Sequence, residues 1–219
     1  MTTLTGTTPS TIDQILEKAP VLPVLTIDDL ETAAPLAETL FEAGLPVVEV
    51  TLRTPVALEA IGRMREAVSG MIIGAGTVLV EDDLKRVERA GAAFAISPGG
   101  TPALYRAAAR ASIPFVPGVA TASEVMAGLE LGWQRFKFFP AEAAGGVATL
   151  KSWLGPLPDA RFCPTGGISG HNATEYLRLD NVLTVGGSWM VPGDAIGARD
   201  WPRIAALAGD CVNLLNNRN

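Results

Sequence analysis

The chain has 219 residues, of which 48% are hydrophobic and 18% are charged. This length and composition allow one domain with a substantial core and exclude extensive disorder. The formal net charge is −6 and the 17 basic residues are scattered, which excludes a basic face for nucleic acid or for a membrane surface. The longest uncharged stretch, residues 90–105, is interrupted by glycines and prolines, so it could not cross a bilayer as a helix.

Cysteine and histidine are too rare for a disulfide framework or a zinc cluster. Cys163 and Cys211 form no CxxC pair, and the one histidine, His171, is expected to be a solvated residue at a helix start. We therefore expect chemistry without a metal and without a cofactor. The first lysine is Lys18, so the basic start of a signal peptide is missing, and a cytoplasmic protein is expected.

Short β-rich runs alternate along the chain with stretches of helical periodicity. Eight such alternations, without the Gly-x-Gly-x-x-Gly turn of dinucleotide-binding sheets, predict a single-domain (β/α)8 TIM barrel over residues 1–219 rather than an open doubly wound sheet. The predicted strands cover residues 21–26, 47–52, 71–75, 93–96, 114–116, 134–139, 161–164 and 182–185.

Helix starts support these boundaries. Residues 1–10 are expected to be a frayed tail, and residues 11–20 are expected to form an extra helix that closes the bottom of the barrel. Thr54-Pro55 and Thr101-Pro102 each predict a cap followed by a proline in the first turn, and residues 121–124 read as a capping box.

The second predicted strand carries polar residues on one face. Period-two alternation places Glu49, Thr51 and Arg53 together, with aliphatic side chains on the other face. Such groups are costly to bury unless they are paired or used. We interpret Glu49 as a general acid/base and Arg53 as the group that binds a substrate carboxylate. The alternative is a structural ion pair between Glu49 and Arg53.

The third and fourth predicted strands end in small residues. Gly74-Ala-Gly-Thr77 clears space beside the hydroxyl of Thr77 at the mouth of the barrel, where active sites lie. The run Ser97-Pro-Gly-Gly100 is similar, and we expect it to shape the pocket wall. The alternative for both runs is an ordinary tight turn.

The sixth predicted strand places Lys137 between aromatic residues near its end. Desolvation favours the neutral amine of a lysine over the ammonium, and a neutral amine attacks carbonyl groups to form a Schiff base. We interpret Lys137 in this way. The alternative is a snorkelling or salt-bridged lysine at an edge.

Glycine pairs follow the seventh and eighth predicted strands, in Thr165-Gly-Gly-Ile168 and Gly186-Gly-Ser188. Barrels often bind phosphate after these two strands through backbone N–H groups and helix N-termini. The alternative is a plain turn between strand and helix. The predicted phosphate-binding residues are Gly166, Gly167, Gly187 and Ser188.

Six motifs of the chain are long and distinctive. They are Glu49-Val-Thr-Leu-Arg-Thr54, Gly74-Ala-Gly-Thr-Val78, Ile96-Ser-Pro-Gly99, Phe136-Lys-Phe-Phe-Pro-Ala-Glu142, Phe162-Cys-Pro-Thr-Gly-Gly-Ile168 and Gly186-Gly-Ser-Trp189. Together they resemble the KDPG aldolase family, the bacterial 2-dehydro-3-deoxy-6-phosphogluconate aldolases, which often also act on 4-hydroxy-2-oxoglutarate. The resemblance runs from about residue 12 to residue 216.

This resemblance implies a homotrimeric class I aldolase of the Entner–Doudoroff pathway, which cleaves KDPG to pyruvate and glyceraldehyde 3-phosphate. It implies that Lys137 forms the Schiff base and that Glu49 shuttles protons. The remaining implied contacts are Arg53, Thr77 and Thr165 at the pyruvyl end, Phe139 beside the imine, Pro98 at the pocket wall, and Gly166, Gly167, Gly187 and Ser188 at the phosphate.

Two alternatives stay open. An aldolase for the epimeric 2-dehydro-3-deoxy-6-phosphogalactonate would use the same chemistry and differ in substrate. A non-catalytic phosphosugar-binding barrel would need the glycine turns but would give no purpose to Lys137 and Glu49.

Overall fold

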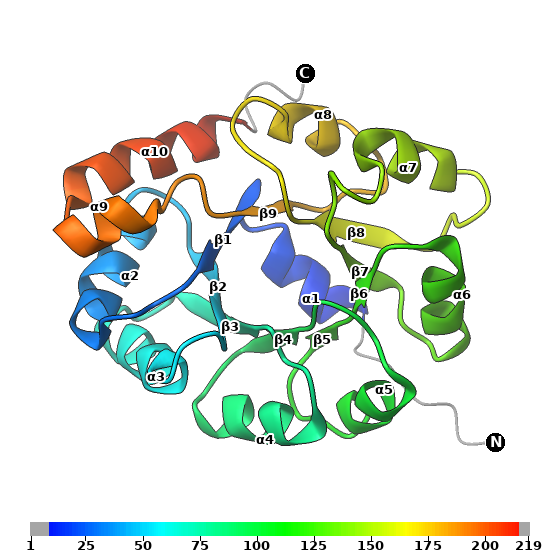
Figure 1. Cartoon of the computed structure of the whole chain (residues 1–219), viewed down its shortest axis with the longest axis horizontal. Helices are drawn as coiled ribbons and strands as arrows, with labels where there is room; N and C mark the ends of the chain where they lie inside the picture. Colours follow the sequence, from blue (N-terminus) through cyan, green and yellow to red (C-terminus); the bar gives the residue numbers. More distant parts are fainter. Residues whose placement is uncertain (1–8, 215–219) are drawn as a thin grey trace.

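The computed structural model describes residues 9–214, as a curled parallel β-sheet with helices along its outer side (Figure 1). Strands and helices alternate along the chain, as the sequence predicts. The strands are β1 (Val21–Leu25), β2 (Val47–Thr51), β3 (Ile72–Gly76), β4 (Phe94–Ile96), β5 (Phe115–Val116), β6 (Gly118–Val119), β7 (Arg135–Phe138), β8 (Arg161–Pro164) and β9 (Val185–Gly187).

All strand pairings are parallel and fall into two groups. Six strands pair in the order β5-β4-β3-β2-β1-β9, and three pair in the order β6-β7-β8. Pro117 separates β5 from β6, and its carbonyl accepts a hydrogen bond from the N–H of Lys137 at 2.9 Å. An isolated bridge between Thr165 and Gly186 links the ends of β8 and β9.

One observed strand was not predicted and one predicted strand is shifted, whereas the other predicted strands differ from the observed ones by at most one residue at either end. The short strand β6 was not predicted, because Pro117 lacks an N–H and interrupts the β-rich run. The last strand, β9, begins at Val185 and includes Gly186 and Gly187, which the sequence analysis assigned to a turn. Glycine is depleted in strands, so a propensity argument ends the strand too early.

Apart from α1, the helices lie around the outer side of the sheet (Figure 1). The predicted capping box is confirmed, since Thr121 and Glu124 cap each other at the start of α6. The predicted start at Thr54-Pro55 is wrong, because α3 begins at Ala57. The helices are α1 (Pro9–Leu16), α2 (Ala33–Glu42), α3 (Ala57–Ala67), α4 (Glu81–Arg89), α5 (Pro102–Ala108), α6 (Ala122–Glu130), α7 (Gly146–Trp153), α8 (Ala173–Leu177), α9 (Gly193–Ala198) and α10 (Trp201–Asn213), with a short 3₁₀ helix at Leu30–Thr32.

Helix α1 lies on the inner side of the curled sheet, near the middle of Figure 1. Its buried residues Ile12 and Leu16 pack on strand residues that include Leu22 and Val47. The helix spans Pro9–Leu16 rather than the predicted residues 11–20, and residues 1–8 of the predicted tail lie outside the described residues.

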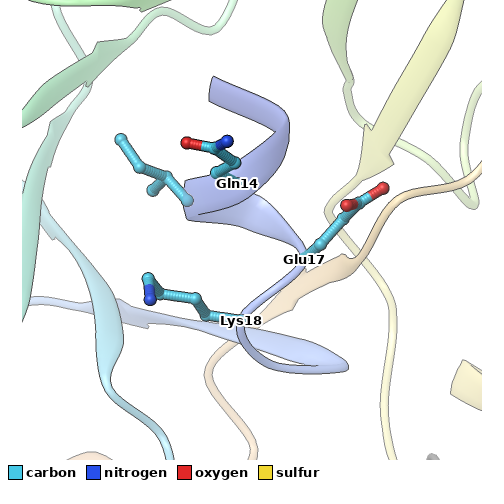
Figure 2. A pocket seen from close by; sticks show the side chains of 4 residues that line it. Gln14, Glu17 and Lys18 are labelled. Atoms are coloured by element: carbon cyan, nitrogen blue, oxygen red, sulfur yellow. The ribbon is translucent and has the colours of Figure 1, made fainter. Parts of the chain in front are cut away.

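A hollow of about 410 Å³ lies beside α1, lined by Gln14, Ile15, Glu17 and Lys18 (Figure 2). All four residues come from α1 and the turn that follows it. None of them belongs to the predicted site. Within the described part of the chain, no helix is long and apolar enough to cross a membrane.

Candidate functional site

A buried ion pair between Lys137 on β7 and Glu49 on β2 forms the centre of the candidate site. The Lys137 Nζ lies 2.9 Å from Glu49 Oε1 and 3.2 Å from Oε2. Lys137 is 5% exposed and Glu49 is 1% exposed. Both side chains therefore point into the space that the curled sheet encloses, where an amine and a carboxylate can exchange a proton directly.

The backbone around Glu49 leaves room for its carboxylate. Glu49 pairs with Val24 of β1 and with Gly74 of β3. A β-carbon at Gly76, the last residue of β3, would lie 2.0 Å from Glu49 Oε1. Only glycine at position 76 is compatible with the observed position of Glu49.

Phe139 lies on the same side of the chain as Lys137, two residues further on. Its ring centroid is 5.4 Å from the Lys137 Nζ. The neighbouring Phe136 and Phe138 are buried in the outer core instead. Lys137 thus lies between two buried aromatic residues of β7, with the half-buried ring of Phe139 beside its amine.

The three polar residues that the sequence places on one face of β2 have different surroundings in the structure. The Thr51 hydroxyl donates to the Leu25 carbonyl at 2.9 Å, which ties β2 to β1. Arg53 lies in the turn after β2 and is exposed. The alternative of a structural Glu49–Arg53 ion pair is wrong, because the described ion pair of Glu49 is with Lys137. The salt-bridged form predicted as an alternative for Lys137 is observed, but in the interior rather than at an edge.

Thr77 and Pro98 lie directly beyond the carboxyl ends of β3 and β4. Thr77 is half-buried and has a φ of 61°, a left-handed conformation that is uncommon for a residue with a β-carbon. Pro98 is half-buried, and a β-carbon at Gly118 would lie 2.2 Å from its carbonyl carbon. Gly118 therefore allows the loop after β4 to approach β6, a role that the sequence analysis missed.

Thr165, Gly166 and Gly167 follow β8 immediately. Thr165 is buried, and a β-carbon at Gly186 would lie 2.3 Å from its hydroxyl oxygen. The φ angles of Gly166 and Gly167 are 102° and 79°. Two consecutive left-handed residues are accessible to glycine and strained for other residues, so the pair is more than an arbitrary turn.

The backbone N–H groups of this turn are available to a ligand. The carbonyl groups of Thr165, Gly166 and Gly167 all accept hydrogen bonds. Among residues 9–214, no acceptor meets the N–H of Gly166 or Gly167. Ser188 is exposed beyond the end of β9, and its N–H has no acceptor in this part of the chain either. Backbone N–H groups without an acceptor are suited to bind an anion.

Gly187 is part of β9, with Trp189 against it. A β-carbon at Gly187 would lie 2.0 Å from the Trp189 ring. The residue is thus required for close packing, whatever its role toward a ligand.

Cys163 occupies the position next to Lys137 on β8 but is not a candidate nucleophile. It is 1% exposed, and burial raises the pKa of its thiol to about 12, with the nearby Lys137 opposing that shift. A thiol with this pKa remains protonated at neutral pH. The amine of Lys137 then remains as the candidate nucleophile of the site.

Among the described residues, no group of three or more Asp, Glu, His or Cys side chains could hold a metal ion. His171 is exposed in the turn before α8.

Sequence analysis also missed the contact between Glu142 and Tyr176. Glu142 follows β7, and its carboxylate accepts a hydrogen bond from the hydroxyl of Tyr176 on α8. Glu142 stands in a motif that carries the family resemblance, but the sequence contains no signal that links it to a tyrosine 34 residues away.

The chain matches the family model described as KDPG and KHG aldolase over residues 12–207. It is 50% identical over 200 residues to the KHG/KDPG aldolase of Escherichia coli strain K12, covering 91% of this chain and 94% of that protein.

Two solved structures are similar over nearly the whole chain. The KDPG aldolase of Legionella pneumophila, with pyruvate captured as a covalent carbinolamine, is 48% identical with a TM-score of 0.89, over 91% of this chain and 97% of that one. The enzyme of Zymomonas mobilis ZM4 with 3-phosphoglycerate is 48% identical with a TM-score of 0.90, over 94% and 97%.

The raised pKa of Cys163 predicts that iodoacetamide at pH 8 leaves the folded protein unlabelled. At a pKa of about 12 the thiolate fraction at this pH is on the order of 10⁻⁴. Cys211 should also stay unlabelled in the folded protein, because burial raises its thiol pKa to about 12 as well. Mass spectrometry should find two labels after unfolding in guanidinium. Rapid labelling of Cys163 in the folded protein would contradict the assignment of an inert thiol.

Proposed function

The chain belongs to the KDPG and KHG aldolase family, and we propose that it is a class I aldolase that cleaves 2-dehydro-3-deoxy-6-phosphogluconate to pyruvate and glyceraldehyde 3-phosphate. It also acts on 4-hydroxy-2-oxoglutarate. The observation that carries this function is the buried amine of Lys137 within 2.9 Å of the Glu49 carboxylate. The reaction is that of the Entner–Doudoroff pathway, and we place it in the cytoplasm.

The reaction begins at Lys137. Its ammonium transfers a proton to Glu49, and the neutral amine adds to the C2 ketone of the substrate. The carbinolamine then loses water, with the proton supplied through Glu49, and leaves an iminium ion on Nζ. The iminium carries a positive charge adjacent to C3, which makes it an acceptor for the electron pair of the C3–C4 bond.

Cleavage and release use the same two residues. Glu49 takes the proton of the C4 hydroxyl, the C3–C4 bond breaks, and its electron pair forms an enamine on Lys137. Glyceraldehyde 3-phosphate leaves as the aldehyde. Protonation of the enamine at C3 and hydrolysis of the imine then release pyruvate and restore the amine.

The pyruvyl end of the substrate lies beside Lys137 in this proposal. Arg53 binds the carboxylate through a bidentate pair, since its exposed guanidinium stands at the carboxyl end of β2. Phe139 covers one side of the imine, which its position 5.4 Å from Nζ supports. Thr77, Pro98 and Thr165 complete this end, and all three follow the carboxyl ends of strands.

The phosphate lies at the turns after β8 and β9. The N–H groups of Gly166, Gly167 and Ser188, which meet no acceptor among the described residues, support this assignment. The hydroxyl of Ser188 adds a donor, and Gly187 leaves room for the Trp189 ring at the end of β9. In this proposal the carbon chain of the substrate extends from Lys137 to the turns after β8 and β9.

The alternatives are weaker. An aldolase for the epimeric phosphogalactonate would share every step above, but the relatives at 45% to 51% identity carry the names of KDPG or KHG/KDPG aldolases. A binding module without catalysis would not explain why two charged side chains are buried together inside the sheet.

We also propose that the strands form one closed (β/α)8 barrel in a single domain, with α1 across its bottom. Three observations support closure: the pairing of β9 with β1, the bridge from Thr165 to Gly186, and the hydrogen bond from Lys137 to Pro117. The ion pair of Asp13 on α1 with Arg135 on β7, at 2.6 Å, supports α1 as a plug.

We propose a homotrimer, as the family resemblance implies. Leu79 and Val80 support an interface beyond β3, because they are among the large apolar side chains that are more than half exposed. Light scattering should give three times the mass of the chain at micromolar concentration. A mass equal to that of one chain would contradict this assembly.

Reduction of the imine tests the function directly. With pyruvate and borohydride, we expect one reduced pyruvyl group per chain, located at Lys137 by peptide mass spectrometry, and complete loss of turnover. Lys137→Met should abolish the adduct. The control Lys151→Met removes an exposed lysine of α7 and should leave the adduct intact. An adduct at another lysine, or none, would refute the proposal.

Substitution of Glu49 separates catalysis from folding. Glu49→Gln keeps the shape of the side chain and removes the base, so kcat should fall by roughly 10²–10⁴. Asp13→Asn is the matched control, because it removes an ion-paired carboxylate at the other end of the sheet and should leave kcat unchanged. Circular dichroism checks that both variants fold. Normal turnover of folded Glu49→Gln would mean that the ion pair is only structural.

A further inference from the structure

The Gly166–Gly167 turn needs support from outside, because glycine restricts the backbone least of all residues. The backbone after β7 provides part of it. The N–H of Ala141 donates to the Thr165 carbonyl at 2.8 Å, and the N–H of Glu142 donates to the Gly166 carbonyl at 3.1 Å. These two bonds continue the pairing of β7 with β8 as far as the turn.

The side chain of Glu142 packs against the turn at Gly167. A β-carbon at Gly167 would lie 2.6 Å from Glu142 Cγ, so the two residues are in close contact. The Glu142 carboxylate then accepts the hydrogen bond from Tyr176, whose side chain is fully buried on α8. A single side chain thus connects the Gly167 backbone to the core beneath α8.

Asn172 holds the opposite side of the same turn. Its Nδ2 donates to the Gly167 carbonyl at 3.3 Å, and its Oδ1 accepts from the N–H of Ser169 at 2.8 Å. With its carbonyl groups engaged on both sides, the turn keeps its N–H groups directed away from these partners. The arrangement therefore fixes the direction of the Gly166 and Gly167 N–H groups and leaves both without an acceptor among the described residues.

We propose that Glu142 and Tyr176 are positioning residues that hold the Gly166–Gly167 turn in the shape that binds the substrate phosphate. They thereby determine how strongly the site prefers a phosphorylated 2-oxo acid over an unphosphorylated one. This inference rests on the proposed function, which it extends to the choice between two substrates. Neither residue has a described contact with Lys137, so we expect changes at the pair to act mainly on the phosphate end of the substrate.

The hydroxyl of Tyr176 is suited to a permanent donor role. Burial and the hydrogen bond to Glu142 raise its pKa well above the ordinary range, so it stays protonated wherever the enzyme works. Tyr105, the other tyrosine of the chain, is also buried but lies on α5 with its ring against Trp133. It provides a matched control for removal of a buried hydroxyl.

The test compares KDPG with 4-hydroxy-2-oxoglutarate. Tyr176→Phe keeps the ring and removes the donor, so kcat/KM for KDPG should fall about tenfold, mainly through KM, with less than about a twofold change for the unphosphorylated substrate. Glu142→Ala should give the same pattern. The double variant should lose little more activity, because each single change already removes the same hydrogen bond. Glu142→Gln keeps an acceptor oxygen and should restore most of the activity on KDPG.

Controls separate this role from general stability. Tyr105→Phe should leave the ratio of the two kcat/KM values unchanged. If Tyr176→Phe does not fold, Glu142→Ala decides alone, because Glu142 is an exposed residue outside the hydrophobic core. Equal losses on both substrates, or no loss on KDPG, would overturn the proposal.

The wild type distinguishes a failure of this inference from a failure of the proposed function. A wild type without turnover and without a pyruvate adduct would refute the aldolase. Calorimetry with inorganic phosphate then still tests the pair, since Tyr176→Phe should weaken phosphate binding and Tyr105→Phe should not. Equal phosphate binding by wild type and Tyr176→Phe would overturn the positioning role.

Discussion

The burial of Lys137 against Glu49 is the constraint on which the rest of the structure depends. Each charge taken out of water costs several kcal/mol, which only a close and well-directed pair can offset. The two residues are 88 positions apart, so the sheet must curl far enough to bring β7 across from β2. In the proposed mechanism, the contact that stabilises both charges also moves the proton to and from the amine. Fold and chemistry therefore share one interaction.

Glycines on the inner side of the sheet provide the space that this interaction needs. Gly76 leaves room for the Glu49 carboxylate, and Gly186 leaves room for the Thr165 hydroxyl. A β-carbon at Gly76 would overlap the Glu49 carboxylate, and one at Gly186 would overlap the Thr165 hydroxyl. Both glycines lie in or next to strands, where glycine lowers stability. In return, each leaves space for a polar side chain on the inner side of the sheet.

The two ends of the proposed substrate meet different kinds of structure. Rigid strands hold Lys137 and Glu49, which must be aligned for covalent chemistry. In the proposal, turns beyond the strands present the phosphate donors, and the pair of Glu142 and Tyr176 supports the Gly166–Gly167 turn. Binding energy from the phosphate end can then be used at the imine end, because both are fixed to the same sheet.

By itself the sequence determined the alternation of strands and helices, the inward side of Glu49, and the common side of Lys137 and Phe139. These follow from the two-residue period of a strand and from caps, which are properties of neighbouring residues. Only the tertiary structure decided that Glu49 pairs with Lys137 rather than Arg53, and that Tyr176 donates a hydrogen bond to Glu142 beside the Gly166–Gly167 turn. Such pairs join distant segments, and their formation depends on how far the sheet curls, which no local pattern encodes.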